Sequence, residues 1–303
     1  MAHAVTGRAR ARIGLLGNPG DLDGGTVLAA TIDTFETVVE ISRTTFYAPP
    51  AFLSDAADLQ RLAFDRVAAG RAGCALTLRT DVPRQSGLSG SGAILVATLR
   101  ALDAYFDLDL LSLDVARIAW EIERDDLGIV AGPQDRVIQA LGGLQLMDFS
   151  GHNPIGSHRP IDAALLPPLL IAWPDKPGQP SGDTHRTIWE RAQAGDVDLR
   201  KQLIEFSRIA SDGTTALERG DVTTFADAID ANFDLRASVF ELVGDDRQLI
   251  DVARAAGGAA KFCGSGGAIV AMARPGGDVE RIGDALEASG ASVRCGVRIA
   301  LAP

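Results

Sequence analysis

The chain has 303 residues, a formal net charge of −11 and a hydrophobic fraction of 46%. This length favours two domains, because one domain usually spans about 100–200 residues. The acidic balance, without any Lys/Arg-rich stretch, argues against nucleic acid or an anionic membrane as partner and is compatible with a small substrate. No apolar run reaches the ~18 residues of a membrane span, so a cytoplasmic location is expected.

In the first half of the chain, the predicted strands and helices alternate. Strands are predicted at residues 12–17, 27–33, 36–42, 74–80 and 144–149 from short apolar or β-branched runs. Helices are predicted at residues 57–69, 94–105, 113–122 and 137–141, with Ser112 as the N-cap of the third.

A polar, glycine- and proline-containing stretch, SGHNPIGSHRP, separates this half from the next. It predicts domains at 1–158 and 159–303. The second half is predicted to be helical over 184–242, with breaks near Gly195, Gly213 and Gly220. Then come a helix at 246–256, strands at 259–262 and 268–273, a helix at 279–288 and a strand at 293–301. The mixture indicates an α+β protein.

Glycine is in excess: it makes up 33 of the 303 residues, about 11%, against about 7% in an average protein. The glycines gather at residues 14–25, 87–92 and 264–267. The middle group, in PRQSGLSGSGAILVATLRAL, directly precedes a long aliphatic helix. Glycines let a ligand approach the backbone, and the free N–H groups of a first helical turn suit a phosphate. The alternative is a turn that only caps the helix.

Other common sites are excluded by their patterns. No GxxxxGK[ST] loop and no strand–GxGxxG–helix unit occurs, so a nucleotide would bind through a different loop. Three widely spaced cysteines without CxxC indicate neither a disulfide framework nor a zinc site. Of these, Cys263 is expected to be a small buried side chain. Lys261 is expected on the surface, with a phosphate contact as the alternative.

Three segments, in order, resemble the motifs of the GHMP kinases, which include galactokinase and mevalonate kinase. ARIGLLGNPGDLDGG is similar to the amino-terminal substrate motif, residues 83–93 to the phosphate loop, and FCGSGGAIVAM to the carboxy-terminal glycine-rich loop. LLGNP and LGIVAGPQDRVIQALGGLQLMDF most resemble the glucuronokinases within that superfamily. The resemblance implies an S5-like N-terminal α/β domain and a ferredoxin-like C-terminal α+β domain.

The resemblance also implies an activity. It is the ATP- and Mg²⁺-dependent phosphorylation of the anomeric hydroxyl of D-glucuronate. The same fold acting on another sugar, a sugar acid or a small alcohol is one alternative. A non-catalytic sensor that binds nucleotide or sugar is another. The oligomeric state stays open.

Roles for individual residues follow from the resemblance. Asp135 matches the catalytic aspartate. Arg12 is the second expected catalytic residue: Arg12 or Arg136 could hold the transferring phosphate or the substrate, and Arg12 could pair with a uronate carboxylate. Glu123, twelve residues before Asp135, matches the magnesium ligand, with Glu121 as the rival. Ser91 is the expected hydroxyl partner of the metal, and Ser89 is the alternative. The phosphate-binding set is Gly87, Leu88, Ser89, Gly90, Ser91 and Gly92. The substrate-binding set is Arg12, Asn18, Asp21, Asp135, Arg136, Gly264, Ser265, Gly266 and Gly267.

Two departures from the family pattern stand out. The phosphate loop reads Gly-Leu-Ser-Gly-Ser-Gly rather than the commoner Gly-Leu-Gly-Ser-Ser-Ala, which bears on the metal-facing hydroxyl. The substrate loop has Gly20 and Asp23 where the plant-type enzymes carry a serine and aromatic residues, which bears on the sugar.

Overall fold

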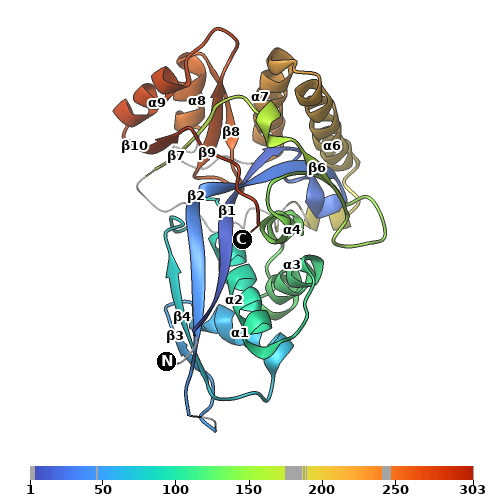
Figure 1. The fold of residues 1–303 in the computed structure, drawn as a ribbon. Helices are drawn as coiled ribbons and strands as arrows, with labels where there is room; N and C mark the ends of the chain where they lie inside the picture. Colours follow the sequence, from blue (N-terminus) through green and yellow to red (C-terminus); the bar gives the residue numbers. More distant parts are fainter. Residues whose placement is uncertain are drawn as a thin grey trace.

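The computed structural model describes residues 4–45, 47–174, 186, 188, 190–240 and 247–302. Figure 1 shows two halves, each a sheet with helices packed against it, and the long strands β1 and β2 run from one half toward the other. The expectation for His185, an exposed side chain of no function, falls outside the described residues, as does the proline-rich loop that precedes it.

The first half contains a six-stranded sheet of order β3-β4-β2-β5-β6, with β1 paired to β2 off this path. Its strands are β1 Val5–Leu16, β2 Thr26–Arg43, β3 Ala51–Leu53, β4 Cys74–Thr80, β5 Leu144–Asp148 and β6 Ser157–Ile161. Two strands predicted at 27–33 and 36–42 are one continuous strand, β2. The partner strand changes between them: β5 pairs with Thr26–Ala30 of β2, and β4 pairs with Thr37–Arg43.

Helices α1 to α4 pack against this sheet on one side (Figure 1). Their bounds are α1 Ala57–Ala68, α2 Gly90–Phe106, α3 Ser112–Glu121 and α4 Gln134–Leu141, and a π-helical turn, η2 Ile122–Asp126, continues α3. Helix α2 packs directly on β1 at Gly7, which has no side chain. A Cβ at that position would overlap the backbone of Ala97 and Ala101. Ser112 is not the N-cap of α3: Leu111 is, and its N–H donates to the Asp114 carboxylate.

The second half is a four-stranded antiparallel sheet of order β10-β7-β9-β8. The strands are β7 Leu169–Pro174, β8 Gly258–Phe262, β9 Ile269–Ala273 and β10 Ala291–Cys295. Helices α6 Val197–Glu218, α7 Val222–Val239 and α8 Gln248–Ala255 lie between β7 and β8 in the chain, and α9 Val279–Ala288 lies between β9 and β10. Across the sheet, the neighbouring strands are therefore the fourth, first, third and second of this half in chain order, which is the predicted ferredoxin-like arrangement.

Three boundaries differ from the sequence prediction. Gly213 does not break the helical segment but lies inside α6, where the absence of a side chain lets Leu16 and Ala228 pack closely. The division predicted after residue 158 falls inside β6, which pairs with β5 in the first sheet, so the domain bounds stay a prediction. The last predicted strand ends at Cys295, and the chain then crosses to the first sheet, where Ile299 bridges Ile32.

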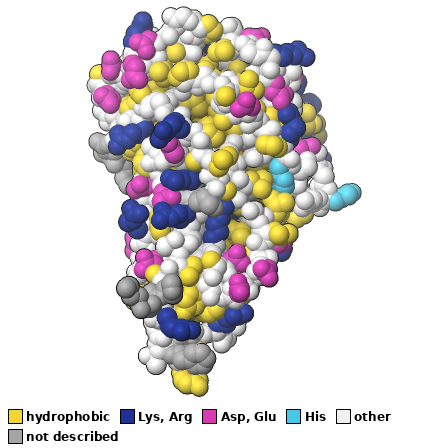
Figure 2. Space-filling view, in the orientation of Figure 1, with side chains coloured by type: hydrophobic (Ala, Val, Ile, Leu, Met, Phe, Trp, Pro, Cys, Tyr) yellow, Lys and Arg dark blue, Asp and Glu magenta, His cyan; other side chains and the backbone are white. Residues whose placement is uncertain are grey.

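The described surface carries both signs of charge. Figure 2 shows lysine and arginine side chains interspersed with aspartate and glutamate over the face in view. Within the described ranges, every helix is too short or too polar to cross a membrane. The predicted cytoplasmic location stays a prediction.

Candidate active site

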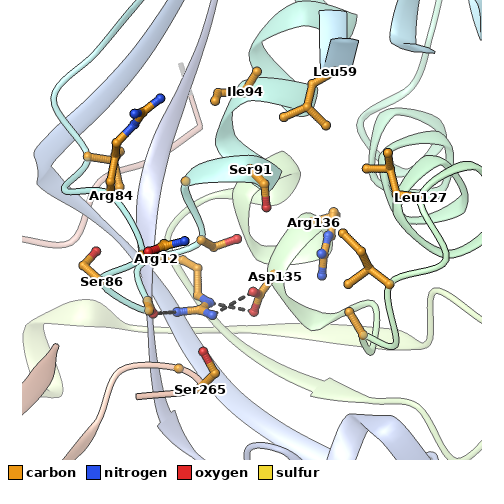
Figure 3. A pocket seen from close by; sticks show the side chains of 18 of the residues that line it. Arg12, Leu59, Arg84, Ser86, Ser91, Ile94, Leu127, Asp135, Arg136 and Ser265 are labelled. Carbon is orange, nitrogen blue, oxygen red and sulfur yellow. Dashed lines mark hydrogen bonds and ion pairs between the residues drawn. The ribbon is translucent and has the colours of Figure 1, made fainter. Parts of the chain in front are cut away.

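A pocket of about 930 Å³ brings together segments that are far apart in the sequence. Its wall comes mostly from the first half and is completed by Arg186, Arg236, Gly264 and Ser265 from the second. Most of the residues predicted from the sequence line it: Arg12, Asn18, Asp21, Gly87, Ser89, Gly90, Ser91, Asp135, Arg136, Gly264 and Ser265. Figure 3 shows Leu59, Ile94 and Leu127 on one side of this space and Ser265 on the other.

The phosphate loop and the carboxy-terminal loop support each other through their backbones. Gly87 has a φ of 76°, and a Cβ there would overlap the carbonyl oxygen of Gly266. Ala268 N–H donates to the Ser86 carbonyl at 2.7 Å, and Gly267 packs against Ser86. Gly266 and Gly267 therefore lie behind the pocket wall, where they hold the phosphate loop in place.

The start of α2 forms one wall of the pocket. Gly90 and Ser91 are its first residues and line the pocket, so unpaired N–H groups of the first turn lie there. Ser89 precedes them in a left-handed conformation with a φ of 61°, and the Gln139 side-chain amide donates to its carbonyl at 3.0 Å.

Two residues of the predicted phosphate-binding set do not line the pocket. The Leu88 side chain is buried in the core, and its carbonyl accepts from the N–H of Arg12 on β1. Gly92 faces Gln139, whose Oε1 would lie 2.5 Å from a Cβ at that position. Both residues shape the loop from behind.

Arg12 and Asp135 form a two-pronged ion pair at the centre of the pocket (Figure 3). Arg12 Nε donates to Asp135 Oδ1 at 2.6 Å and a terminal nitrogen donates to Oδ2 at 2.7 Å. The other terminal nitrogen donates to the carbonyls of Gly87 and Cys263. Burial lowers the pKa of Arg12, but the charge of Asp135 and its hydrogen bonds raise it above the usual value. Arg12 therefore holds the Asp135 carboxylate on the pocket wall.

Asp21 is a second buried carboxyl group in the pocket. It is 6% exposed, and the Gln134 side-chain amide donates to its Oδ1 at 2.8 Å. Burial, together with the negative charge of Asp135, raises the pKa of Asp21 to about 7. The pocket thus contains two neighbouring carboxyl groups in different environments: Asp135 pairs with Arg12, and Asp21 accepts from the Gln134 amide.

Ser91 and Glu123 supply oxygen atoms suited to a hard cation. Ser91 Oγ donates to Glu123 Oε1 at 2.8 Å, and the other Glu123 oxygen pairs with Arg136. Glu121 instead pairs with Arg66 and Arg117 at the surface. Magnesium needs only one or two protein oxygens, with phosphates and water completing its shell. The oxygen donors of this pair are of the kind that Mg²⁺ takes, but Glu123 is 1% exposed and does not line the pocket. The described residues contain no cluster of three or more His, Cys, Asp or Glu ligands.

Arg136 is almost completely buried beside this pair. Its side chain is 6% exposed, and a terminal nitrogen donates to the Gly132 carbonyl at 3.1 Å. Burial and the nearby charge of Arg12 lower the pKa of Arg136 to about 9. Arg136 thus lines the pocket with its charge paired to Glu123.

Lys261 is not on the surface, and it does not line the pocket. It is 1% exposed, and its ammonium donates to the Gly14 carbonyl, Asn18 Oδ1 and the Phe262 carbonyl, each at 2.7 Å. Burial lowers the pKa of Lys261 to about 7. Cys263, next in this strand region, is fully buried as predicted.

Sequence reasoning missed Gln134 and Arg236. Gln134 holds Asp21, and Arg236 on α7 lines the pocket and donates to the Ser265 carbonyl at 2.7 Å. The Arg236 guanidinium lies 4.3 Å from the centre of the Phe240 ring. No local motif marks Arg236, because it lies inside a helix far along the chain from the other pocket residues.

Comparisons with known proteins agree with this geometry. Family models described as the GHMP kinases N terminal domain and the GHMP kinases C terminal region match residues 54–143 and 214–292. The chain is 34% identical to Glucuronokinase 1 of Arabidopsis thaliana, over 88% of this chain and 84% of that protein. The chain belongs to the GHMP kinase family.

Further relatives of this GHMP kinase support the assignment. It is 40% identical to Probable glucuronokinase 2 of Arabidopsis thaliana, over 64% of this chain and 56% of that protein. A galactokinase structure from Lactococcus lactis, complexed with galactose, superposes with a TM-score of 0.83 at 17% identity, covering 99% and 94% of the two chains. The two-domain fold of a GHMP kinase, predicted from three motifs, is thereby confirmed.

Proposed function

We propose that this GHMP kinase transfers the terminal phosphoryl group of ATP to the anomeric hydroxyl of D-glucuronate, giving the 1-phosphate and ADP. The likeness to the two glucuronokinases supports the substrate. The observation that carries the reaction is the Arg12–Asp135 pair, which presents a carboxylate to the pocket beside the phosphate loop.

Asp135 is the proton acceptor in this proposal. The anomeric hydroxyl is more acidic than an ordinary alcohol, which eases the transfer of its proton to a carboxylate. As the hydroxyl oxygen bonds to the phosphorus atom, the bond from phosphorus to the bridging oxygen of ADP breaks. The proton passes to Asp135, and the electron pair of the broken bond leaves with ADP.

The phosphates would lie against the loop around Gly87 and the first turn of α2, where backbone N–H groups face the pocket. Ser91 and Glu123 would hold Mg²⁺, which neutralises phosphate charge when it is bound. Arg136, on the same wall, adds a positive charge that orients the transferred group or the substrate.

The sugar would contact Asn18, Asp21 and the carboxy-terminal loop at Gly264 and Ser265. Arg12 is a poor candidate for the uronate carboxylate, because its guanidinium already donates four hydrogen bonds to acceptors within the protein. Its role in this proposal is to position Asp135.

A coupled assay of ADP release tests the activity. Purified protein with ATP and Mg²⁺ is expected to turn over glucuronate in preference to glucose, galactose and mevalonate. Turnover of a neutral sugar without turnover of glucuronate would contradict the proposed substrate. Inactivity on the whole panel, with a thermal shift on ATP and Mg²⁺, would favour the non-catalytic sensor.

A further inference from the structure

A buried lysine, Lys261, lies behind the substrate side of the pocket, and the proposed reaction does not use it. Lys261 on β8 lies behind the first loop, and three oxygen atoms at 2.7 Å use all three N–H bonds of its ammonium. One of these oxygens belongs to the side-chain amide of Asn18, which lines the pocket. Lys261 therefore touches the pocket through Asn18.

This contact decides which end of the amide faces the pocket. In its ammonium form Lys261 can only donate hydrogen bonds, and Asn18 Oδ1 is the atom that lies 2.7 Å from its Nζ. Nδ2 is on the opposite branch of the amide, and it donates to no residue within the described ranges. Asn18 thus offers the pocket N–H groups and keeps its carbonyl oxygen away from it.

We propose that Lys261 is a positioning residue that sets the substrate class, because it fixes Asn18 as a hydrogen-bond donor to the carboxylate of an acidic sugar. The inference rests on the proposed function. A charged acceptor forms a stronger bond with N–H than a neutral hydroxyl does. An outward-facing carbonyl, or a carboxylate at position 18, would instead repel an anionic substrate and favour a hydroxyl.

Two variants test this assignment through substrate preference. The ratio of kcat/KM for glucuronate to kcat/KM for glucose is measured, because these sugars differ only at the carboxylate carbon. Asn18→Asp removes the donor and is expected to lower the ratio about 10- to 100-fold, mostly through KM for glucuronate. Lys261→Met releases the amide and is expected to lower the ratio by about threefold to tenfold.

Asn232, on α7, gives a matched control that contacts the same loop. Its side chain accepts from Gly17 N–H and donates to the Asn18 carbonyl, so it holds the loop backbone without touching the Asn18 amide. Asn232→Ala is expected to raise KM for both sugars by the same factor and leave the ratio unchanged. The thermal shift with ATP and Mg²⁺ reports whether each variant is folded.

The outcomes separate the two proposals. If the native protein does not turn over glucuronate, the proposed function fails and this inference fails with it. If the native protein prefers glucuronate but Asn18→Asp keeps that preference, only this inference is overturned. If Lys261→Met does not fold, Asn18→Asp alone decides, and an unchanged ratio in that variant contradicts the role of the amide.

Discussion

The two sides of the pocket are built on different principles. The phosphate side is local: Ser86, Gly87 and the start of α2 are consecutive in the chain and offer mainly backbone groups. The substrate side is assembled from Asn18 after β1, Asp135 on α4 and Arg236 on α7. Phosphates are alike in every nucleotide, so a backbone cradle serves them, whereas a sugar must be recognised by side chains.

This difference explains why substitutions on the two sides should act differently. A change in the phosphate loop alters the backbone and affects nucleotide binding whatever the sugar. A change on the substrate side alters one contact and affects the rate, or the choice of sugar, while the nucleotide still binds. Four predictions, in order of expected effect, test that separation.

Asp135→Asn is expected to lower kcat by about 10²- to 10⁴-fold, because the proton acceptor is lost while the pocket keeps its shape. The thermal shift with ATP and Mg²⁺ should remain. Asp114→Asn, in the first turn of α3 and outside the pocket, is the control and should leave kcat unchanged. An unchanged rate in Asp135→Asn would remove this residue from the proposed mechanism.

Gly87→Ala is expected to abolish most of the ATP-induced thermal shift. The left-handed backbone alone costs about 1–2 kcal/mol for alanine, and the added Cβ would also displace the Gly266 carbonyl. Gly70→Ala is a matched control, since its φ is +80° and nothing lies within 4 Å of an added Cβ. Equal losses of nucleotide binding in the two variants would contradict the contact between the loops.

Ser91→Ala is expected to raise, by less than about tenfold, the Mg²⁺ concentration needed for the ATP-induced thermal shift. The effect is limited because phosphates and water supply most magnesium ligands. Ser89→Ala is the comparison, because Ser89 Oγ donates to Gln139 Oε1 at 3.3 Å, whereas Ser91 Oγ donates to Glu123. A larger change in Ser89→Ala would assign the metal hydroxyl to that residue.

Asp21→Asn is expected to stabilise the ligand-free protein by a margin that grows with pH. The pKa of Asp21 is about 7 in the folded protein and 3.8 for the free group. The Asp21 carboxyl therefore keeps its proton to a higher pH in the folded state than in the unfolded state. The free energy of unfolding falls as the pH rises from about 4 to 7. The melting temperature of Asp21→Asn minus that of the native protein should be larger at pH 8 than at pH 5.

The control for this prediction is Asp23→Asn, in the same short turn but exposed to solvent. Its melting temperature should follow the native protein at both pH values. A pH-independent difference for Asp21→Asn would indicate that the Asp21 carboxyl is not held in its protonated form near neutral pH.

Much of the site could be predicted from the sequence because its motifs are local. The loop around Gly87 and the aspartate after GIVAGPQ are recognisable as strings, and both line the pocket. The elements with clear periodicity were also predicted well, such as β4 and α9. Strand β2 was divided in two, because its partner changes from β5 to β4 along its length and the sequence does not record that change.

Length, charge, the glycine excess and three ordered motifs by themselves determined the α+β class, the family and the neighbourhood of Asp135. These properties depend on backbone conformation and on residues close in the chain. Only the tertiary structure decided that Arg12 is committed to Asp135, that Lys261 is buried against Asn18, and that Arg236 reaches the pocket. Such partners are 123 or more residues apart or lie within an ordinary helix. Folding brings them together, and no local pattern records the contact.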